Sequence, residues 1–310
     1  MNKLFKISAA GLLLAAVSQA QIEINENLSF TGFFDMSVVH TDSDSGGDDT
    51  SYNFDQAELD FIFSFEELTG QVDLNYLGDN DTGDFSLEQA FITYDLGEGS
   101  SVTAGKFLSF HGWETAEPTG LFQYSYAYDL VGTIPGYFNG VSYGYNTDAM
   151  SLGFSLVDSI YGADGSLSDS EYGIEAKAAF FPVEGATIYL GYAVDNMDTG
   201  EDMTLVNLWA SYEVGNATYA VEVNDYDFGG DAEGNQWLVM ANYGITDSLG
   251  ITFRVSEDED GTINESATKY TISPGWSVGE NLLMLMEVSN TDFGSEGDDL
   301  AIAFETLFTF

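Results

Sequence analysis

Few residues of this chain could support acid–base or metal chemistry. It has no cysteine and only two histidines, His40 and His111. These counts exclude thiolate zinc sites and cysteine nucleophiles, and a lone histidine cannot build a histidine-based zinc site. Ser109 and Glu114 lie near His111 in the sequence, but a hydrolase triad is defined by spatial geometry and not by adjacency. We therefore predict no enzymatic activity, and a hydrolase is the less favoured alternative.

Carboxylates dominate the charged residues. The chain has 52 acidic and 6 basic residues and a formal net charge of −46. Nucleic acid is excluded as a partner, because phosphate binding requires clustered Lys and Arg. A charge of this size is tolerated in salty water, where ions screen the repulsion, and it also attracts cations to the protein. We expect both a salty habitat and a cation-attracting interior.

Three acidic segments contain fragments of a calcium-binding loop, but none has the full spacing that ends in a glutamate. The candidate ligands are Asp42, Asp44, Asp79, Asp81, Asp258 and Asp260. We interpret them as a solvated acidic surface that binds Ca²⁺ or Mg²⁺ loosely, and we expect no other cofactor. Specific calcium sites are the alternative.

Residues 1–20 have the pattern of a secretory signal peptide. Lys3 and Lys6 precede an apolar stretch, and Ser18 and Ala20 give small side chains at the −3 and −1 positions of a cleavage site. The alternative is an uncut N-terminal anchor. No later apolar run approaches the ~20 residues of a spanning helix. The remaining way to cross a bilayer is a closed β-barrel, which pairs every backbone group.

The chain after residue 20 repeats a unit of about ten residues in which apolar and polar side chains alternate, followed by a turn. The pattern predicts an all-β transmembrane antiparallel barrel of about sixteen strands as a single domain over residues 21–310. The expected strands are 28–40, 53–65, 71–77, 85–96, 101–109, 136–145, 150–157, 172–181, 186–195, 203–214, 217–225, 236–243, 249–257, 267–278, 282–290 and 300–310.

Short and long connections alternate along the chain, as they do in outer-membrane barrels. The short turns include Gly215-Asn216, and the long acidic loops include residues 41–50, 78–84 and 258–266. We expect the short turns on the periplasmic side and the long loops outside the cell.

The two faces of the strands differ in chemistry. Ile188, Leu190 and Tyr192 alternate with polar or small residues, and a charge that faces lipid near the midplane costs about 2–4 kcal/mol. The charged phase must therefore face the interior. The acids predicted to line the lumen are Asp35, Glu58, Asp60, Asp73, Glu175, Glu222, Glu287 and Glu305, and the basic residues are Lys106, Lys177, Arg254 and Lys269. Each basic residue is predicted to pair with a carboxylate, although avoidance of lipid alone would give the same phase.

Four basic residues cannot neutralise this lumen, so water should solvate most of its acids. This argument favours an open pore over a plugged interior, and about sixteen strands are enough to enclose a channel.

The third long connection, residues 110–135, is the longest and is rich in aromatic residues. Phe122, Tyr124, Tyr126 and Tyr128 recur at every second position, which favours a loop folded against the inner wall over one that covers the barrel mouth. Glu114, Glu117 and Asp129 would then face the solute path as constriction residues.

This arrangement resembles the general porins, in which the third loop folds inward as a constriction. Gly105-Lys106-Phe107, with Glu114 following, is similar to the OmpL-like β-barrel porin family. Two features depart from the general porins: the loop lacks their Pro-Glu-Phe-Gly-Gly motif, and their facing arginine cluster is absent because Arg254 is the only arginine.

The terminal Phe310 resembles the signal by which the barrel-assembly machinery recognises outer-membrane proteins of Gram-negative bacteria. The resemblances imply an outer-membrane porin, a passive diffusion channel for small hydrophilic solutes and ions. A homotrimer is the usual assembly of the general porins, but no sequence feature establishes one here. The acidic lumen adds a preference for cations. The alternative function is a structural or adhesive barrel whose acidic loops bind partners or divalent cations.

Overall fold

The computed structural model describes residues 21–78, 85–114, 116–128, 133–162, 171–196, 201–229, 232–260 and 265–310. The predicted signal peptide, residues 1–20, lies outside the described residues. The strands are β1 Ile22–Asn25, β2 Leu28–Ser43, β3 Gly47–Phe65, β4 Leu68–Leu77, β5 Phe85–Gly97, β6 Ser100–Leu108, β7 Tyr137–Asn146, β8 Met150–Val157, β9 Tyr172–Phe180, β10 Ala186–Asn196, β11 Met203–Val214, β12 Ala217–Asp227, β13 Glu233–Thr246, β14 Leu249–Asp260, β15 Glu265–Ser277, β16 Leu282–Asp292 and β17 Asp298–Thr309. Two short 3₁₀ helices, η1 Pro118–Gly120 and η2 Gly294–Glu296, lie in connections.

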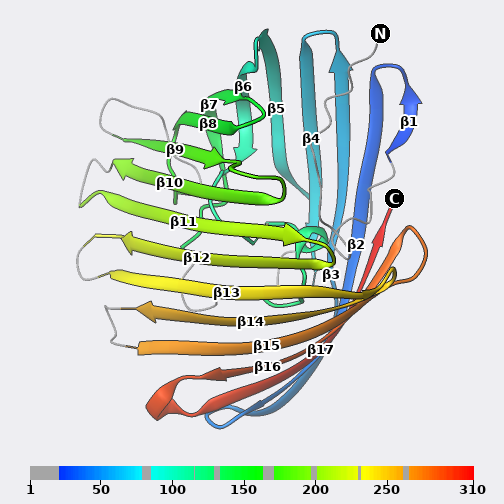
Figure 1. The fold of residues 1–310 in the computed structure, drawn as a ribbon, viewed down its shortest axis with the longest axis vertical. Helices are drawn as coiled ribbons and strands as arrows, with labels where there is room; N and C mark the ends of the chain where they lie inside the picture. Colours follow the sequence, from blue (N-terminus) through cyan, green and yellow to red (C-terminus); the bar gives the residue numbers. More distant parts are fainter. Residues whose placement is uncertain are drawn as a thin grey trace.

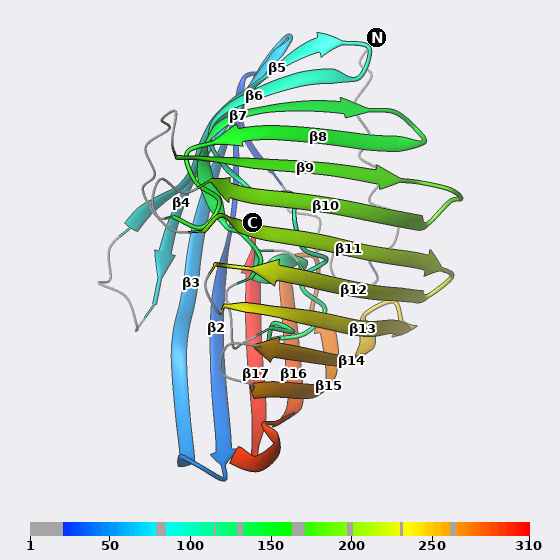
Figure 2. The same cartoon turned by 90° about the vertical axis from the view of Figure 1, so that its left-hand side faces the viewer.

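Strands β2 to β17 form a closed antiparallel barrel of 16 strands (Figures 1 and 2). Each strand pairs with its neighbours in sequence, and β17 returns to β2 with a register that runs from Asp299 opposite Ser43 to Thr309 opposite Phe33. Closure leaves no unpaired strand edge, which a membrane requires because lipid offers no hydrogen-bond partners. The predicted fold class is confirmed, whereas the short strand β1, which pairs with β2, was missed.

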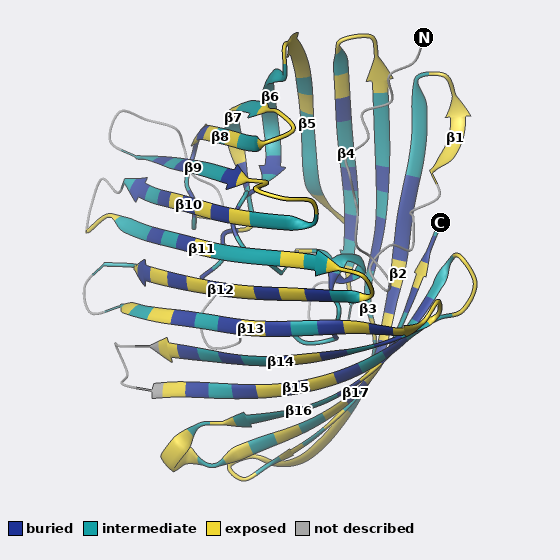
Figure 3. Cartoon of the chain, in the orientation of Figure 1, coloured by how far each residue is buried: buried dark blue, intermediate teal, exposed yellow. Residues whose placement is uncertain are grey.

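Burial alternates along several strands, and Figure 3 shows it as alternating dark and light bands on β10, β12 and β13. On β10, Ile188, Leu190 and Tyr192 are 52%, 49% and 44% exposed on the outer face, whereas Tyr189 and Ala193 face the interior at 4% and 0%. The outer face is therefore apolar, as lipid contact requires. Among the described residues no helix is long and apolar enough to cross a membrane.

The acidic segment 41–50 is not a loop, and this prediction was wrong. β2 and β3 continue their ladder to the pair Ser43–Gly47. The turn between them is tightened by the Ser43 hydroxyl, which accepts a hydrogen bond from the Gly46 N–H (3.2 Å), and by Gly47 at φ +81°. A ladder that is already in register extends at little entropic cost, so polar residues continue it past the bilayer.

Aromatic rings line the outer face where the chain ends meet. The ring of Phe34 lies 5.4 Å from that of Phe310 and 6.0 Å from that of Phe54. The Phe310 carbonyl accepts hydrogen bonds from the Thr31 hydroxyl (2.9 Å) and the Gly32 N–H (3.0 Å). The terminal residue therefore completes the seam between β17 and β2.

Candidate pore and its third loop

The connection between β6 and β7, residues 109–136, is called the third loop below, and its described residues, 109–114, 116–128 and 133–136, lie inside the barrel (Figures 1 and 2). Its first arm, residues 109–114, donates hydrogen bonds to acceptors on the inner wall. Glu175 on β9 accepts from the Ser109 hydroxyl (2.8 Å) and from the Phe110 N–H (3.3 Å). Glu222 on β12 accepts from the Trp113 N–H (3.0 Å). Two predicted lumen acids thus bind the loop backbone.

The second arm, residues 122–128, is bound by side chains of strands β14 to β16. Glu287 accepts a hydrogen bond from the Ser125 N–H (3.0 Å). The Ser256 hydroxyl donates to the Ala127 carbonyl (3.0 Å), and the Lys269 Nζ donates to the Tyr126 carbonyl (2.9 Å). Wall side chains therefore satisfy the polar groups of a loop with little regular secondary structure of its own, as burial of its backbone requires.

Arg254 on β14 links the two arms. Its guanidinium donates to Glu114 of the first arm (2.5 Å) and to the Ser125 carbonyl of the second (2.7 Å). It also donates to the Ser125 hydroxyl, the Tyr126 carbonyl and the Thr271 hydroxyl. Arg254 is 1% exposed. Several donors in a fixed fork let this one side chain set the position of both arms.

The alternating aromatic residues of the loop do not form one face. Phe122 and Tyr128 pack against a buried cluster that contains Leu238 and Met240. Tyr124 meets Ser37 on β2 at 3.2 Å between hydroxyl oxygens, and Tyr126 is 39% exposed. The strictly extended backbone needed for a single face is absent, because η1 and the bends around it turn the chain.

Glu114 is not free to face a solute, because it is paired with Arg254 and also accepts from the Ala127 N–H (2.8 Å). Glu117 accepts from Tyr137 (2.7 Å) and from Gln56 on β3 (3.4 Å). Burial and the neighbouring Glu88 raise the pKa of Glu117 to about 7. The third predicted constriction residue, Asp129, lies outside the described residues.

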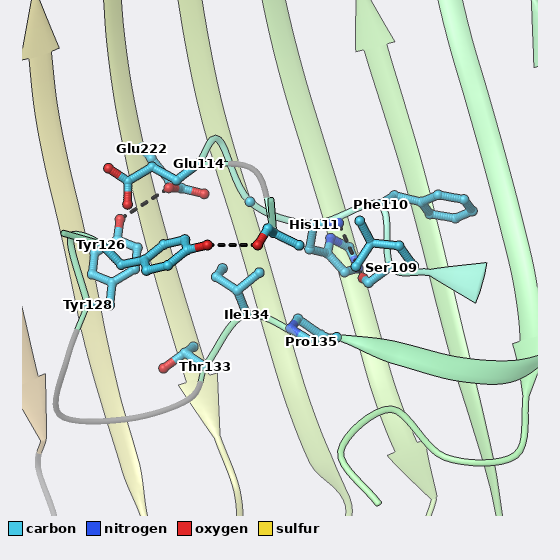
Figure 4. Close-up of a pocket in the computed structure, with 14 residues that line it drawn as sticks. Ser109, Phe110, His111, Glu114, Tyr126, Tyr128, Thr133, Ile134, Pro135 and Glu222 are labelled. Carbon is cyan, nitrogen blue, oxygen red and sulfur yellow. Dashed lines mark hydrogen bonds between the residues drawn. The ribbon is translucent and has the colours of Figure 1, made fainter. Parts of the chain in front are cut away.

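The third loop borders a cavity of about 440 Å³ (Figure 4). Tyr126, Tyr128 and Glu222 line one side, and Ile134 and Pro135 lie on another. The Tyr128 hydroxyl donates to Glu222 at 3.2 Å. The lining is mainly hydrocarbon and aromatic, with its carboxylates already engaged by the loop.

His111 also borders this cavity but is not placed for hydrolysis. The Ser109 hydroxyl donates to Glu175 and not to the imidazole, so the hydroxyl has no general base of the kind a triad provides. His111 Nε2 lies 3.7 Å from a Glu175 oxygen. Burial and the Lys177 charge lower the pKa of His111 to about 4, which leaves the ring neutral near pH 7.

The lumen acids are covered rather than solvated, which corrects the argument for a wide water-filled pore. The eight predicted residues are at most 6% exposed: Asp35, Glu58, Asp60, Asp73, Glu175, Glu222, Glu287 and Glu305. The third loop and neighbouring side chains shield them. The sequence could not show this, because it does not place a loop against particular strands.

The basic residues differ in their contacts. Arg254 makes the predicted carboxylate pair. Lys177 faces the interior, where its Nζ lies 4.6 Å from the centre of the Phe110 ring and forms no ion pair with a described carboxylate. Lys106 lies on the opposite phase of β6 from buried Phe107, and its Nζ donates to the Leu87 carbonyl (3.0 Å). The prediction that Lys106 lines the pore is therefore wrong.

The six predicted divalent-cation ligands do not come together in the part of the chain that the structure describes. Asp42 and Asp44 belong to the β2–β3 hairpin, and Asp258 is buried on β14, where it accepts from Gln236 at 2.9 Å. Asp79 and Asp81 lie outside the described residues, as does the side chain of Asp260. Carboxylates instead converge on the wall: Glu58, Asp60 and Asp73 form one group, and Glu58, Glu88 and Glu117 form another.

Charge is segregated around the lumen. Strands β16, β17 and β2 to β5 contain no Lys or Arg. Their inner acids, called the acidic wall below, are Asp35, Asp55, Glu58, Asp60, Asp73, Glu88, Glu287 and Glu305. Lys177, Arg254 and Lys269 belong to β9, β14 and β15. The alternation of residues along the sequence indicated which acids face the lumen. Only the order of the strands in the barrel shows that one side of it has no basic residue.

A closed antiparallel barrel with an apolar outer face, a polar interior and an inward loop defines an outer-membrane β-barrel protein. Residues 22–310 match the family model described as "Putative beta-barrel porin-2, OmpL-like". The chain belongs to this OmpL-like porin family, and it is a channel protein of the bacterial outer membrane. No curated protein sequence matches it.

Solved porin structures share the fold at low identity. OprB of Pseudomonas putida is 13% identical over 92% of this chain and 94% of its own, with a TM-score of 0.74. The outer membrane channel DcaP of Acinetobacter baumannii is 13% identical over 91% and 97%, with a TM-score of 0.71. The anion-selective porin from Comamonas acidovorans is 14% identical over 91% and 99%, with a TM-score of 0.69.

Proposed function

We propose that this protein is a narrow, cation-preferring diffusion channel for small hydrophilic solutes. The observation that carries the proposal is the acidic wall, which no Lys or Arg of its own strands neutralises. Fixed carboxylates in a low-dielectric lumen raise the local concentration of cations and repel anions. We place the solute path along the exposed side of the third loop at Ala116 and Tyr126, where Glu88 is an acid of the wall that is not fully buried.

The third loop makes the channel narrow. Its backbone is bound to Glu175, Glu222 and Glu287, and Arg254 links its arms. A loop held from several strands occupies lumen volume that sixteen strands would otherwise leave to water. In this arrangement three basic residues of the lumen contact the third loop: Arg254, Lys177 and Lys269. The acids of the acidic wall determine whether cations or anions permeate more readily.

The remaining contacts of the protein follow from its surface. The apolar outer face contacts membrane lipid, and Phe310 is the residue we propose for recognition by the barrel-assembly machinery. A homotrimer is the oligomeric state to test first, because solved general porins take this form.

Reversal potential across a KCl gradient in planar bilayers tests the proposal. We expect potassium to permeate more readily than chloride. Glu88→Gln, a change on the acidic wall, should lower this preference, and Asp48→Asn on the exposed β2–β3 hairpin should leave it nearly unchanged. A preference for chloride would refute cation selectivity. No conductance from correctly folded protein would favour a structural or adhesive barrel.

A further inference from the structure

The inner face of β3 and β4 contains a compact group of acids. Asp60 lies opposite Asp73 and Glu58 lies opposite Asn75 in the ladder between these strands. Carboxylate oxygens of Glu58, Asp60 and Asp73 lie within 4.8 Å of one another, and the three residues are 3%, 6% and 0% exposed. Like charges this close repel strongly when they are shielded from water.

Two carboxylate oxygens of this group lack a hydrogen-bond donor in the part of the chain that the structure describes. Oδ1 of Asp60 and Oδ1 of Asp73 are buried without a partner among the described residues. Asn75 is a separate indication of a bound cation, because its side chain is neutral. It is 3% exposed, its Nδ2 is held by Glu88, and its Oδ1 also has no donor in the described part of the chain. Buried oxygens of this kind are costly unless a cation or donor meets them.

The described strands around this group supply no positive charge to it. Strands β2 to β5 contain no Lys or Arg. Lys106 on the following strand has its Nζ at the Leu87 carbonyl, on the outward phase. A cation from solution can supply the compensating charge. Three carboxylates and an amide oxygen suit Ca²⁺, which accepts six to eight oxygen ligands in variable geometry, better than Mg²⁺, which keeps its own water molecules.

We propose that Glu58, Asp60 and Asp73, together with the amide oxygen of Asn75, bind one Ca²⁺ ion on the lumen wall. The site differs from the acidic loop segments of the sequence, because its ligands come from the paired strands β3 and β4. Strand pairing sets their relative positions before the ion arrives, which reduces the entropy lost on binding.

Binding has a consequence for the third loop. Glu58 also belongs to the group formed with Glu88 and loop residue Glu117. A Ca²⁺ ion on Glu58 offsets the repulsion between Glu58 and Glu117, so it holds this end of the loop at the wall. Arg254 binds the loop directly at Glu114 and Ser125, and these contacts need no ion. The effect on conduction rests on the proposed channel function, whereas binding itself does not.

Direct binding tests the site. The full-length folded protein in detergent is titrated with Tb³⁺, which tyrosine sensitises, and then with Ca²⁺ in about 1 M KCl, where the screening length of ~3 Å suppresses diffuse binding. We expect one displaceable ion per chain. Asp60→Asn and Asp73→Asn each remove the charge of a proposed ligand, so each should weaken binding by at least the roughly 10- to 100-fold that is typical when a residue supporting a ligand is changed. The control Asp195→Asn changes a lumen-facing acid that is 2% exposed and lies on β10, outside the group, so it should bind like wild type.

Equal binding by wild type and both cluster variants overturns the site, and so does equal loss in all three variants. Heat-modifiable gel mobility verifies that each variant has a folded barrel. Chelation of Ca²⁺ should increase current fluctuations in wild type and Asp195→Asn but not in Asp60→Asn. Cation-selective current without site-specific binding refutes the site alone. Site-specific binding without current supports the site and refutes the proposed channel function.

Discussion

Replacement of Arg254 by Met should release the third loop without opening the barrel. Methionine keeps much of the hydrocarbon of the side chain and removes its donors to Glu114, Ser125 and Tyr126. The strand ladder does not involve these side-chain donors, so closure between β17 and β2 should persist. The perturbation therefore separates loop position from barrel assembly.

The free-energy cost of the substitution follows from the burial of the ion pair between Arg254 and Glu114. The Arg254 side chain is fully buried and that of Glu114 is 11% exposed. Removal of one partner from such a pair costs about 3–5 kcal/mol, because the other charge is left uncompensated. Among the remaining contacts between loop and wall, a neutral hydrogen bond is worth about 0.5–1.5 kcal/mol and one to a charged group about 1.5–3 kcal/mol. Loss of Arg254 should therefore shift the loop toward detached states even though Glu222 and Glu287 still bind its backbone.

Single-channel recording and liposome swelling with neutral sugars measure the outcome. Arg254→Met should raise conductance, open-channel noise and the sugar size limit. Adding Glu114→Gln should recover part of the wild-type behaviour, because no buried charge is then left unpaired. Lys106→Met is the control, since Lys106 lies on the outward phase of β6 and its Nζ donates to the Leu87 carbonyl and not to the third loop. Unchanged conductance and size limit in folded Arg254→Met would show that Arg254 does not hold a constricting loop.

Three further predictions concern the loop and the seam. Deletion of residues 114–126 should raise both conductance and the sugar size limit, and unchanged values in an assembled barrel would place the constriction elsewhere. His111→Gln should conduct like wild type between pH 5 and pH 8, because the pKa of His111 is lowered to about 4. The folded pKa lies below the ordinary value near 6.5, so stability from the neutral ring is present above 6.5 and is lost as the pH falls to 4; a wild-type step near pH 6.5 that the variant lacks would contradict this. Phe310→Ala should slow assembly in vivo, and yields of folded barrel equal to wild type would argue against a role in recognition.

Most strand positions were predictable, because alternation of apolar and polar residues has a direct physical cause in lipid on one side and water or polar groups on the other. Strands 150–157 and 203–214 were predicted with their observed bounds. The extensions of β2 and β3 were not, because beyond the bilayer no alternation is required and the ladder alone maintains the strand. The lipid-facing phase of Lys106 became clear only from its pairing with Ala90 and Asn139.

By itself the sequence determined the class of protein, the apolar outer face and the excess of inward carboxylates, because these properties depend on residue type and on a period of two. The tertiary structure decided which acids meet. Glu175 binds a loop residue that is 65 positions away in the sequence, and Glu222 binds one that is 109 positions away. Arg254 pairs with Glu114 over a separation of 140 positions. Closure of the barrel also decided that β16, β17 and β2 to β5 form one side of the lumen without a basic residue. Such contacts depend on strand order and on the path of the third loop, and a local pattern contains neither.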